Sequence, residues 1–249
     1  MTLRESNAYA PDAFREGLTR LGYRVTINGA SCGPDDVLVV WNRRRGEEHM
    51  IRAYEARGAR VLVIENGYLG TDADGGKLFA IAHEHHSGAG RWPEGDGSRW
   101  DALGIELAPW RDDGDHILIL GQRSIGEEGV AMPEGWVERT VARLHKTTSR
   151  PVRVRPHPGV ARTDPYDDLR GAWAAVTYSS GAGLKALVAG YPVFCEFNDW
   201  IAADACSGDL DDIEDTWEGD RLPVFQRMAW AQWSRAEIAS GEALARYLG

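Results

Sequence analysis

The stretch Arg153-Val154-Arg155-Pro156-His157-Pro158-Gly159 decides the predicted fold, because it ends a short strand in a rigid, cationic turn. Downstream, a second strand runs into Ser179-Ser180-Gly181, and a helix is predicted directly after it. Ligands of open α/β sheets bind at the carboxyl ends of the strands. Arg155 and His157 at one strand end, with hydroxyls and amides at a helix N-terminus on the other, predict a site for a nucleotide phosphate.

Apolar runs of strand length alternate with amphipathic segments of helical period, which is the pattern of an α/β protein. The expected strands span residues 23–27, 37–41, 60–64, 79–83, 116–120, 152–155, 174–178 and 192–197. The expected helices span residues 11–21, 47–57, 136–145, 166–172, 184–189, 223–234 and 236–247. We predict two Rossmann-like halves with parallel sheets and a cleft between them, comprising residues 1–112 and 113–249.

Composition limits the class of protein. The chain has 249 residues, 43% of them hydrophobic and 27% charged, and no apolar run approaches the roughly 20 residues of a membrane span. The cysteines are scattered and the N-terminus has no signal-peptide pattern, so we expect a soluble protein of the reducing cytoplasm. A formal net charge of -10 argues against broad, nonspecific binding to nucleic acid, although Arg43-Arg44-Arg45 offers a local basic patch.

Glu65 is the candidate general base. It ends a buried strand, and Asn66-Gly67 after it predicts a tight turn that holds the carboxylate rigidly. A carboxylate held in this way suits the removal of a proton from an acceptor hydroxyl. The alternative, that Glu65 caps a helix or pairs with an arginine, is equally compatible with the sequence.

His157 lies between two prolines, which stiffen the backbone around it. A protonated ring, or a neutral ring through its N–H, can bind a phosphate and help a nucleoside phosphate to leave. The alternative is a turn histidine that bonds only to the backbone. The arginines on the same strand and the Ser179-Ser180 turn favour the functional interpretation.

The loop Gly121-Gln122-Arg123 follows an expected strand and is a second candidate for phosphate contacts. It lacks the full Walker and dinucleotide fingerprints, so a plain βα turn is an equal alternative. The run His83-Glu84-His85-His86 has poor spacing for zinc and no cysteine pair nearby, so we expect a polar loop and no metal site. His85 or His86 could still contact an acceptor.

These motifs, in this order, resemble those of GT-B glycosyltransferases: an acid-x-Gly turn at Glu65, His157-Pro158, and then Ser179-Ser180. The likeness is greatest to bacterial sialyltransferases and capsule-type Kdo transferases, over residues 61–69 and 152–194. Asn66 stands where the family often has a second acid, which leaves Glu65 as the only candidate base. The pattern also resembles small phage-encoded glycosyltransferases, which would work in the host cytoplasm.

The resemblance implies a metal-independent enzyme without a cofactor, which moves a hexosyl or other glycosyl group from a nucleotide sugar to a hydroxyl. The first half would bind the acceptor, a saccharide or a hydroxymethylated pyrimidine in phage DNA, and the second half the donor. The expected catalytic residues are Glu65 and His157. The expected phosphate-binding residues are Gly121, Gln122, Arg123, Arg155, His157, Ser179, Ser180 and Gly181. The expected acceptor-binding residues are Asn42, Arg43, Tyr68, His85, His86 and Trp92.

Two other functions fit the same pattern. A sugar-nucleotide epimerase or hydrolase on this fold would consume donor without an acceptor. A non-catalytic nucleotide-binding module would bind the nucleotide and never consume it. Donor consumption measured with and without an acceptor separates the three functions.

Overall fold

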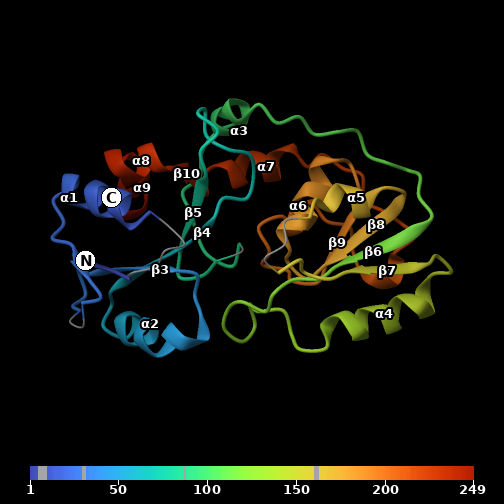
Figure 1. Cartoon of the computed structure of the whole chain (residues 1–249), viewed down its shortest axis with the longest axis horizontal. Helices are drawn as coiled ribbons and strands as arrows, with labels where there is room; N and C mark the ends of the chain where they lie inside the picture. The colour runs from blue at the N-terminus through green and yellow to red at the C-terminus, as the bar shows by residue number, and fades with distance from the viewer. Residues whose placement is uncertain (5–9, 30–31, 87, 160–162) are drawn as a thin grey trace. The chain divides into compact units, whose positions relative to one another are not determined.

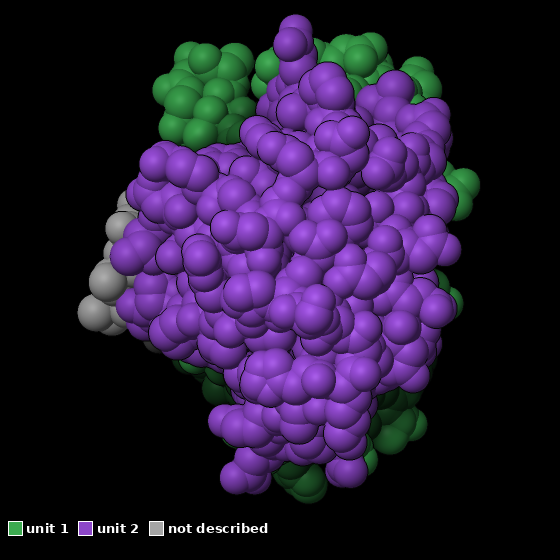
Figure 2. Space-filling model, turned by 90° about the vertical axis from the view of Figure 1, so that its right-hand side faces the viewer, with its two compact units in different colours: residues 1–104, 125–127, 226–249 green, residues 105–124, 128–225 purple. Residues whose placement is uncertain are grey.

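The computed structural model describes residues 1–4, 10–29, 32–86, 88–159 and 163–249, which form two compact units (Figure 1). Unit 1 comprises residues 1–104, 125–127 and 226–249, and unit 2 comprises residues 105–124 and 128–225, as coloured in Figure 2. The units thus differ from the expected ranges 1–112 and 113–249. The C-terminal segment belongs to unit 1 because its strand β10 (Gln232–Ser234) pairs with β5 (Leu78–His83) of that unit.

Unit 1 is built on a six-stranded sheet with the order β10-β5-β4-β3-β1-β2. The other strands are β1 (Thr2–Leu3), β2 (Thr26–Ile27), β3 (Val37–Trp41) and β4 (Arg60–Asn66). The pairs among β1 to β4 are parallel, whereas β5 runs antiparallel to β4, and β10 antiparallel to β5. The strand expected over residues 23–27 is reduced to the two residues of β2. Strand β1 was not predicted, because two residues are too few to form a recognisable apolar run.

Helices cover both faces of this sheet. They are α1 (Pro11–Arg20), the 3-10 turn η1 (Arg45–Glu47), α2 (Glu48–Glu55), α3 (Ser98–Leu103), α8 (Arg235–Ser240) and α9 (Glu242–Leu248). Phe14 of α1 and Leu244 of α9 pack with Ile64 and Trp233 on one face. Ile51 of α2 packs with alternate strand residues on the other face. Successive side chains of a strand point to opposite faces of the sheet, so each central strand contributes apolar residues to the hydrophobic core on either face.

The C-terminal helices differ from the expected ones. The helix predicted over residues 223–234 is α7 (Leu222–Ala229) followed by β10, because Gln232–Ser234 gain ladder hydrogen bonds from β5. The helix predicted over residues 236–247 is two helices, α8 and α9, separated by Gly241 at a φ of 89°. Ser234 and Glu237 form a capping box that starts α8 directly after the strand.

Unit 2 has a fully parallel four-stranded sheet with the order β7-β6-β8-β9. Its strands are β6 (His116–Leu120), β7 (Val152–Arg155), β8 (Ala172–Thr177) and β9 (Val193–Cys195). Its helices are α4 (Trp136–Thr147), α5 (Pro165–Leu169) and α6 (Gly181–Val188), with short 3-10 turns at Ala203–Ala205 and Leu210–Asp212. The helix expected over residues 166–172 ends at Leu169, because Gly171 has a φ of 77° and Ala172 already pairs with β6. The predicted α/β class with parallel sheets is confirmed.

The strand order reverses at β6, which is where a ligand site is expected. After β6 the chain continues through α4 to β7 on one side, and after β8 it continues through α6 to β9 on the other side. In Figure 1, α4 lies on one face of this sheet and α5 and α6 lie on the other. The carboxyl ends of β6 and β8 therefore flank a topological switch point, the usual position of ligands in open α/β sheets. No helix within the described ranges is both long and apolar enough to cross a membrane.

Candidate functional site

Gln122 and Ser179 join the two strand ends at this switch point. The Gln122 side-chain amide donates to Ser179 Oγ at 2.9 Å, and its oxygen accepts from the Ser179 backbone N–H at 2.8 Å. The paired bonds fix the loop after β6 against the turn after β8. The loop Gly121-Gln122-Arg123, predicted either to contact a phosphate or to be a plain βα turn, is thus bonded to the Ser179 turn.

Ser180 begins α6 as its N-cap, because its hydroxyl accepts from the amide of Ala182 at 3.2 Å. Its own N–H donates to Thr177 Oγ1 at 2.8 Å, which holds the turn against the end of β8. Gly181 is the first helical residue and is exposed. The turn therefore presents a helix N-terminus, with its partial positive charge, at the switch point.

His157 follows β7, and the structure defines its tautomer. The Gly159 N–H donates to His157 Nδ1 at 2.9 Å, so Nδ1 carries a lone pair and a neutral ring has its proton on Nε2. Partial burial, and then the positive charges of Arg123 and Arg155, lower the pKa of His157 below its ordinary value of 6.5. His157 is therefore mostly neutral at pH 7, with Nε2–H as its available donor.

The arginines beside His157 have different environments. Arg155 is buried, and its guanidinium donates to Asp168 at 2.6 Å and to the hydroxyl of Thr163 at 2.6 Å, so it braces the loop after β7. Arg123 is exposed, and the described residues give it no ion pair or hydrogen bond. Arg123 is thus the better placed of the two to meet a phosphate.

Gly121 packs where β6 and β7 end side by side. Its N–H donates to the carbonyl of Arg155 at 2.8 Å, and a Cβ at this position would lie 3.1 Å from the same oxygen. The glycine therefore permits the close approach of the two strand ends. Gly121, Gln122, His157, Ser179 and Ser180 belong to one edge of the unit 2 sheet, which we call the strand-end cradle.

In unit 1, Glu65 is half-buried near the carboxyl end of β4 and accepts a hydrogen bond from the Tyr68 hydroxyl. The turn that carries Tyr68 is held by Gln232 of β10. The Gln232 side-chain oxygen accepts from the N–H groups of Tyr68 and Leu69 at 2.8 and 3.0 Å, and its amide donates to the Leu69 carbonyl at 2.7 Å. Gln232 thus orients Tyr68, which in turn orients Glu65.

Arg43, expected at an acceptor site, is buried and surrounded by carboxylates. Its guanidinium donates to Glu55 at 2.6 Å and to Glu48 at 3.0 Å, and Glu127 lies 3.7 Å away. Burial opposes the charge of Arg43, but the hydrogen bonds that it donates to Glu48 and Glu55 raise its pKa overall. Arg43 therefore anchors α2, and the basic run presents the exposed Arg44 and Arg45 instead.

His85 and His86 contact the short segment 125–127 of unit 1. His85 Nδ1 pairs with the Glu127 carboxylate, and His86 Nε2 lies 3.3 Å from the carbonyl oxygen of Ile125. Burial opposes ionisation of Glu127, but the hydrogen bond from His85 and the charge of Arg43 lower its pKa overall. Both histidines thus have structural contacts in this unit.

The remaining acceptor candidates lie in different places. Asn42 follows β3 in the left-handed region, at a φ of 54°, and donates its N–H to the Ile64 carbonyl at 2.8 Å. Trp92 is half-buried, and its indole N–H donates to the Arg227 carbonyl at 3.1 Å. Among the described residues, no group of three or more His, Cys, Asp or Glu side chains is arranged to hold a metal ion.

Several residues that hold the candidate site residues in place could not be recognised from the sequence. Gln232 lay inside an expected helix, and Asp168 and Glu127 lay in segments without a motif. Their partners, Tyr68, Arg155 and His85, are 164, 13 and 42 residues away in the chain (232 − 68, 168 − 155, 127 − 85). A signal in one sequence could not have linked them, because each contact depends on the folded strand order.

The fold is similar to that of two solved Kdo transferase structures. A solved structure of Thermosulfurimonas dismutans KpsC, beta Kdo 2,7 transferase, aligns with a TM-score of 0.59 at 15% identity and covers 98% of each chain. The KpsC beta Kdo 2,4 transferase of the same organism aligns with a TM-score of 0.56 at 14% identity, over 92% of this chain and 90% of that one. No known protein-family profile matches the sequence, and no curated protein matches it. At these identities the similarity establishes the fold, and the chemistry is argued from the side chains.

Proposed function

We propose that the protein is a glycosyltransferase that transfers a sugar from a nucleotide-sugar donor to a hydroxyl of an acceptor. The observation that carries the proposal is the strand-end cradle at the switch point between β6 and β8, where Gln122 fixes Ser179 through two hydrogen bonds. An anion is stabilised there by a helix N-terminus and by neutral N–H donors. The similarity to Kdo transferases supports this assignment at the level of the fold.

In the proposed reaction, Glu65 accepts the proton of the acceptor hydroxyl, and the freed oxygen attacks the anomeric carbon of the donor. A bond forms between that carbon and the acceptor oxygen while the bond to the nucleotide phosphate breaks. The electron pair leaves with the phosphate, where the His157 Nε2–H, Arg123 and the α6 N-terminus stabilise the growing charge. We propose that these groups act without a metal ion.

Thermal unfolding with nucleotides tests the donor site. Wild type, His157→Ala and the matched control His145→Ala, an exposed histidine of α4, are heated with CMP, UMP, UDP, GDP or ADP. A ligand present at about 100 times its Kd stabilises the protein by roughly 2.7 kcal/mol. We expect one nucleotide to stabilise wild type and His145→Ala equally and His157→Ala clearly less. Stabilisation by none at millimolar concentration contradicts the proposal.

A second measurement tests the base. Nucleotide release is followed from sugar conjugates of the stabilising nucleotide, with a panel of saccharide acceptors. Glu65→Gln should lower the rate by roughly 10²- to 10⁴-fold, the range typical of a lost general base. Its stabilisation by the nucleotide should be unchanged. Full activity of Glu65→Gln removes this carboxylate from the mechanism.

A further inference from the structure

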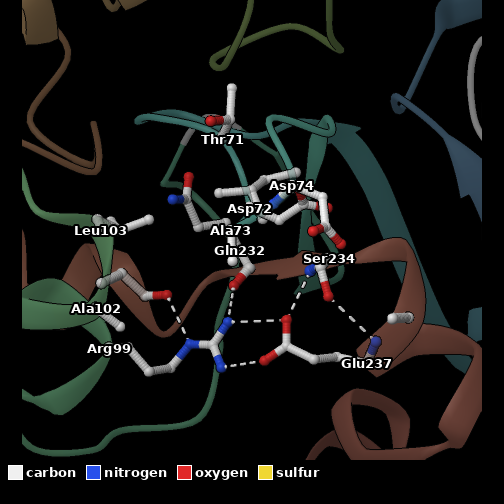
Figure 3. A pocket seen from close by; sticks show the side chains of 13 residues that line it. Thr71, Asp72, Ala73, Asp74, Arg99, Ala102, Leu103, Gln232, Ser234 and Glu237 are labelled. Atoms are coloured by element: carbon white, nitrogen blue, oxygen red, sulfur yellow. Dashed lines mark hydrogen bonds and ion pairs between the residues drawn. The ribbon is translucent and has the colours of Figure 1, made fainter.

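Unit 1 contains a pocket of about 360 Å³ beside the edge strand β10 (Figure 3). The loop 71–74, helix α3 and the start of α8 form its walls, and Gln232 and Ser234 of β10 line it. The volume lies within the range of small-molecule sites, roughly 300–1,000 Å³. None of the residues that the sequence suggested for catalysis or binding lines this pocket, so its role is a separate question.

The strand register places the pocket near the candidate base. Glu65 of β4 pairs with Ala80 of β5, and Ala80 also pairs with Gln232 of β10. Residues paired across neighbouring strands project from the same face of a sheet. Two strand spacings separate the Glu65 and Gln232 backbones, a distance of about 10 Å. The pocket thus begins on the sheet face of Glu65, two strands away.

The pocket combines apolar walls with polar groups. Leu78, Leu103 and Ala236 supply apolar surface. The loop 71–74 contributes Asp72 and Asp74, and Asp72 Oδ1 fixes this loop by accepting from the N–H groups of Asp74 and Gly76. Such a surface matches a sugar ring, which presents C–H groups on one face and hydroxyls around its edge.

The charges of the lining favour particular sugars. Figure 3 shows the Arg99 guanidinium and the Glu237 carboxylate pointing toward one another, and they pair at 2.6 Å. Arg99 also donates to the carbonyl oxygens of Ala229 and Gln232, so its charge is compensated and its donors are engaged. The carboxylates of Asp72 and Asp74 therefore give the pocket lining a net negative charge. An acidic sugar would meet like charges there, whereas an amine-bearing sugar would meet opposite ones.

We propose that this pocket is an acceptor subsite for a neutral or amine-bearing sugar unit, and that it disfavours acidic sugars. The inference rests on the proposed function, because it assigns the bound saccharide to the acceptor. The reacting hydroxyl would lie at Glu65, and the subsite would hold a sugar unit of the same acceptor farther along the sheet. The subsite would thus select acceptors by the charge of a unit that does not react.

Saccharide binding tests the subsite directly. Saturation-transfer NMR is performed with three disaccharides: neutral N,N′-diacetylchitobiose, cationic chitobiose and anionic digalacturonate. We expect the first two to bind and digalacturonate not to bind. Ala236→Trp, which places an indole in the pocket from an exposed position, should weaken binding at least tenfold. The control Ala245→Trp, exposed on α9 and outside the lining, should not.

A charge reversal gives a second, independent readout. Asp74→Lys should weaken binding of cationic chitobiose by about 5- to 10-fold and leave diacetylchitobiose nearly unchanged. Asp113→Lys makes the same change of net charge at an exposed position outside the lining and should alter neither affinity. The difference in affinity between the two disaccharides for Asp74→Lys tests the subsite even if the indole of Ala236→Trp disturbs the start of α8.

The outcomes separate this inference from the proposed function. The subsite is disproved if none of the three disaccharides binds, if digalacturonate binds as tightly as the others, or if Ala236→Trp leaves binding intact. Nucleotide stabilisation of the same protein preparation reports on the donor site. If a nucleotide binds and the disaccharides do not, only the subsite fails. If disaccharides bind in the pocket and no nucleotide binds, the glycosyltransferase proposal fails.

Discussion

Glu65 and Gln232 lie in one row across the unit 1 sheet, because both pair with Ala80 from opposite sides. Gln232 also holds the turn that carries Tyr68, whose hydroxyl bonds to Glu65. A residue close to the C-terminus thus determines how a carboxylate of the first half is presented.

Tyr68→Phe should slow turnover by roughly 10- to 100-fold, because a small displacement of a catalytic group has effects of this size. The hydroxyl that orients Glu65 is lost, while the ring and the backbone bonds to Gln232 remain. A positioning role predicts a lower kcat with little change in KM or in nucleotide stabilisation. Tyr166→Phe, an exposed tyrosine of unit 2, is the matched control. Equal kcat values for Tyr68→Phe and wild type would contradict the role.

Gln232→Leu should destabilise the protein by about 2–4 kcal/mol, because two amides and a carbonyl of the Tyr68-Leu69 turn lose their partner. Gln232→Glu keeps an oxygen that accepts from both amides but cannot donate to Leu69, so its stability should be intermediate. Chemical denaturation at pH 7 measures the three free energies of unfolding. We expect wild type to be the most stable, Gln232→Glu to be intermediate and Gln232→Leu to be the least stable. Equal free energies of unfolding for all three proteins would show that these hydrogen bonds do not stabilise the fold.

His157 should bind the nucleotide as a neutral ring. Because its pKa is lowered below 6.5, few rings are protonated between pH 8 and pH 7, and the Kd for the nucleotide should change less than about twofold there. A tenfold gain in affinity over that interval would identify the protonated ring as the binding form.

The same model separates two substitutions at His157. His157→Gln retains an N–H near the position of Nε2, whereas His157→Ala removes it. A hydrogen bond to a charged group contributes about 1.5–3 kcal/mol, so His157→Ala should lose roughly 10- to 100-fold in affinity, and His157→Gln less. Isothermal titration at pH 7.5 measures both, and equal losses would show that the N–H does not bind the phosphate.

Glu48→Gln should alter the response of stability to acid. The hydrogen bond from Arg43 lowers the pKa of Glu48 from 4.5 to about 2, although partial burial opposes the shift. Since the folded pKa is depressed, this stabilisation is present above pH 4.5 and is lost as the pH falls toward 2. At pH 7 the variant should be less stable by about 2–3 kcal/mol.

Thermal unfolding between pH 7 and pH 3 tests this pH dependence. The difference in Tm between wild type and Glu48→Gln should shrink as the pH falls below 4.5, because Glu48 of the unfolded chain then binds a proton while folded Glu48, with its pKa of about 2, stays mostly ionised. Glu16→Gln breaks an exposed pair with Arg20 and should cost less than about 1 kcal/mol at any pH. A Tm difference that stays constant down to pH 3 would contradict the assigned ion pair.

The sequence by itself determined the α/β class, most of the strands and the strand ends that carry the residues of the strand-end cradle. Apolar runs such as residues 37–41 and 116–120 reveal buried strands, and turn residues mark where the strands end. His157 and Ser179-Ser180 could be recognised because each follows its own strand directly. These signals are local, so a single sequence contains them.

Only the tertiary structure decided which residues meet. It turned the end of an expected helix into β10, brought Gln232 to Tyr68, and surrounded Arg43 with carboxylates. It also formed the pocket beside β10 from segments more than a hundred residues apart. Strand register and ion pairing depend on contacts between residues far apart in the chain. Such contacts can override a local preference for helix, and they produce no periodic pattern in the sequence from which they could be predicted.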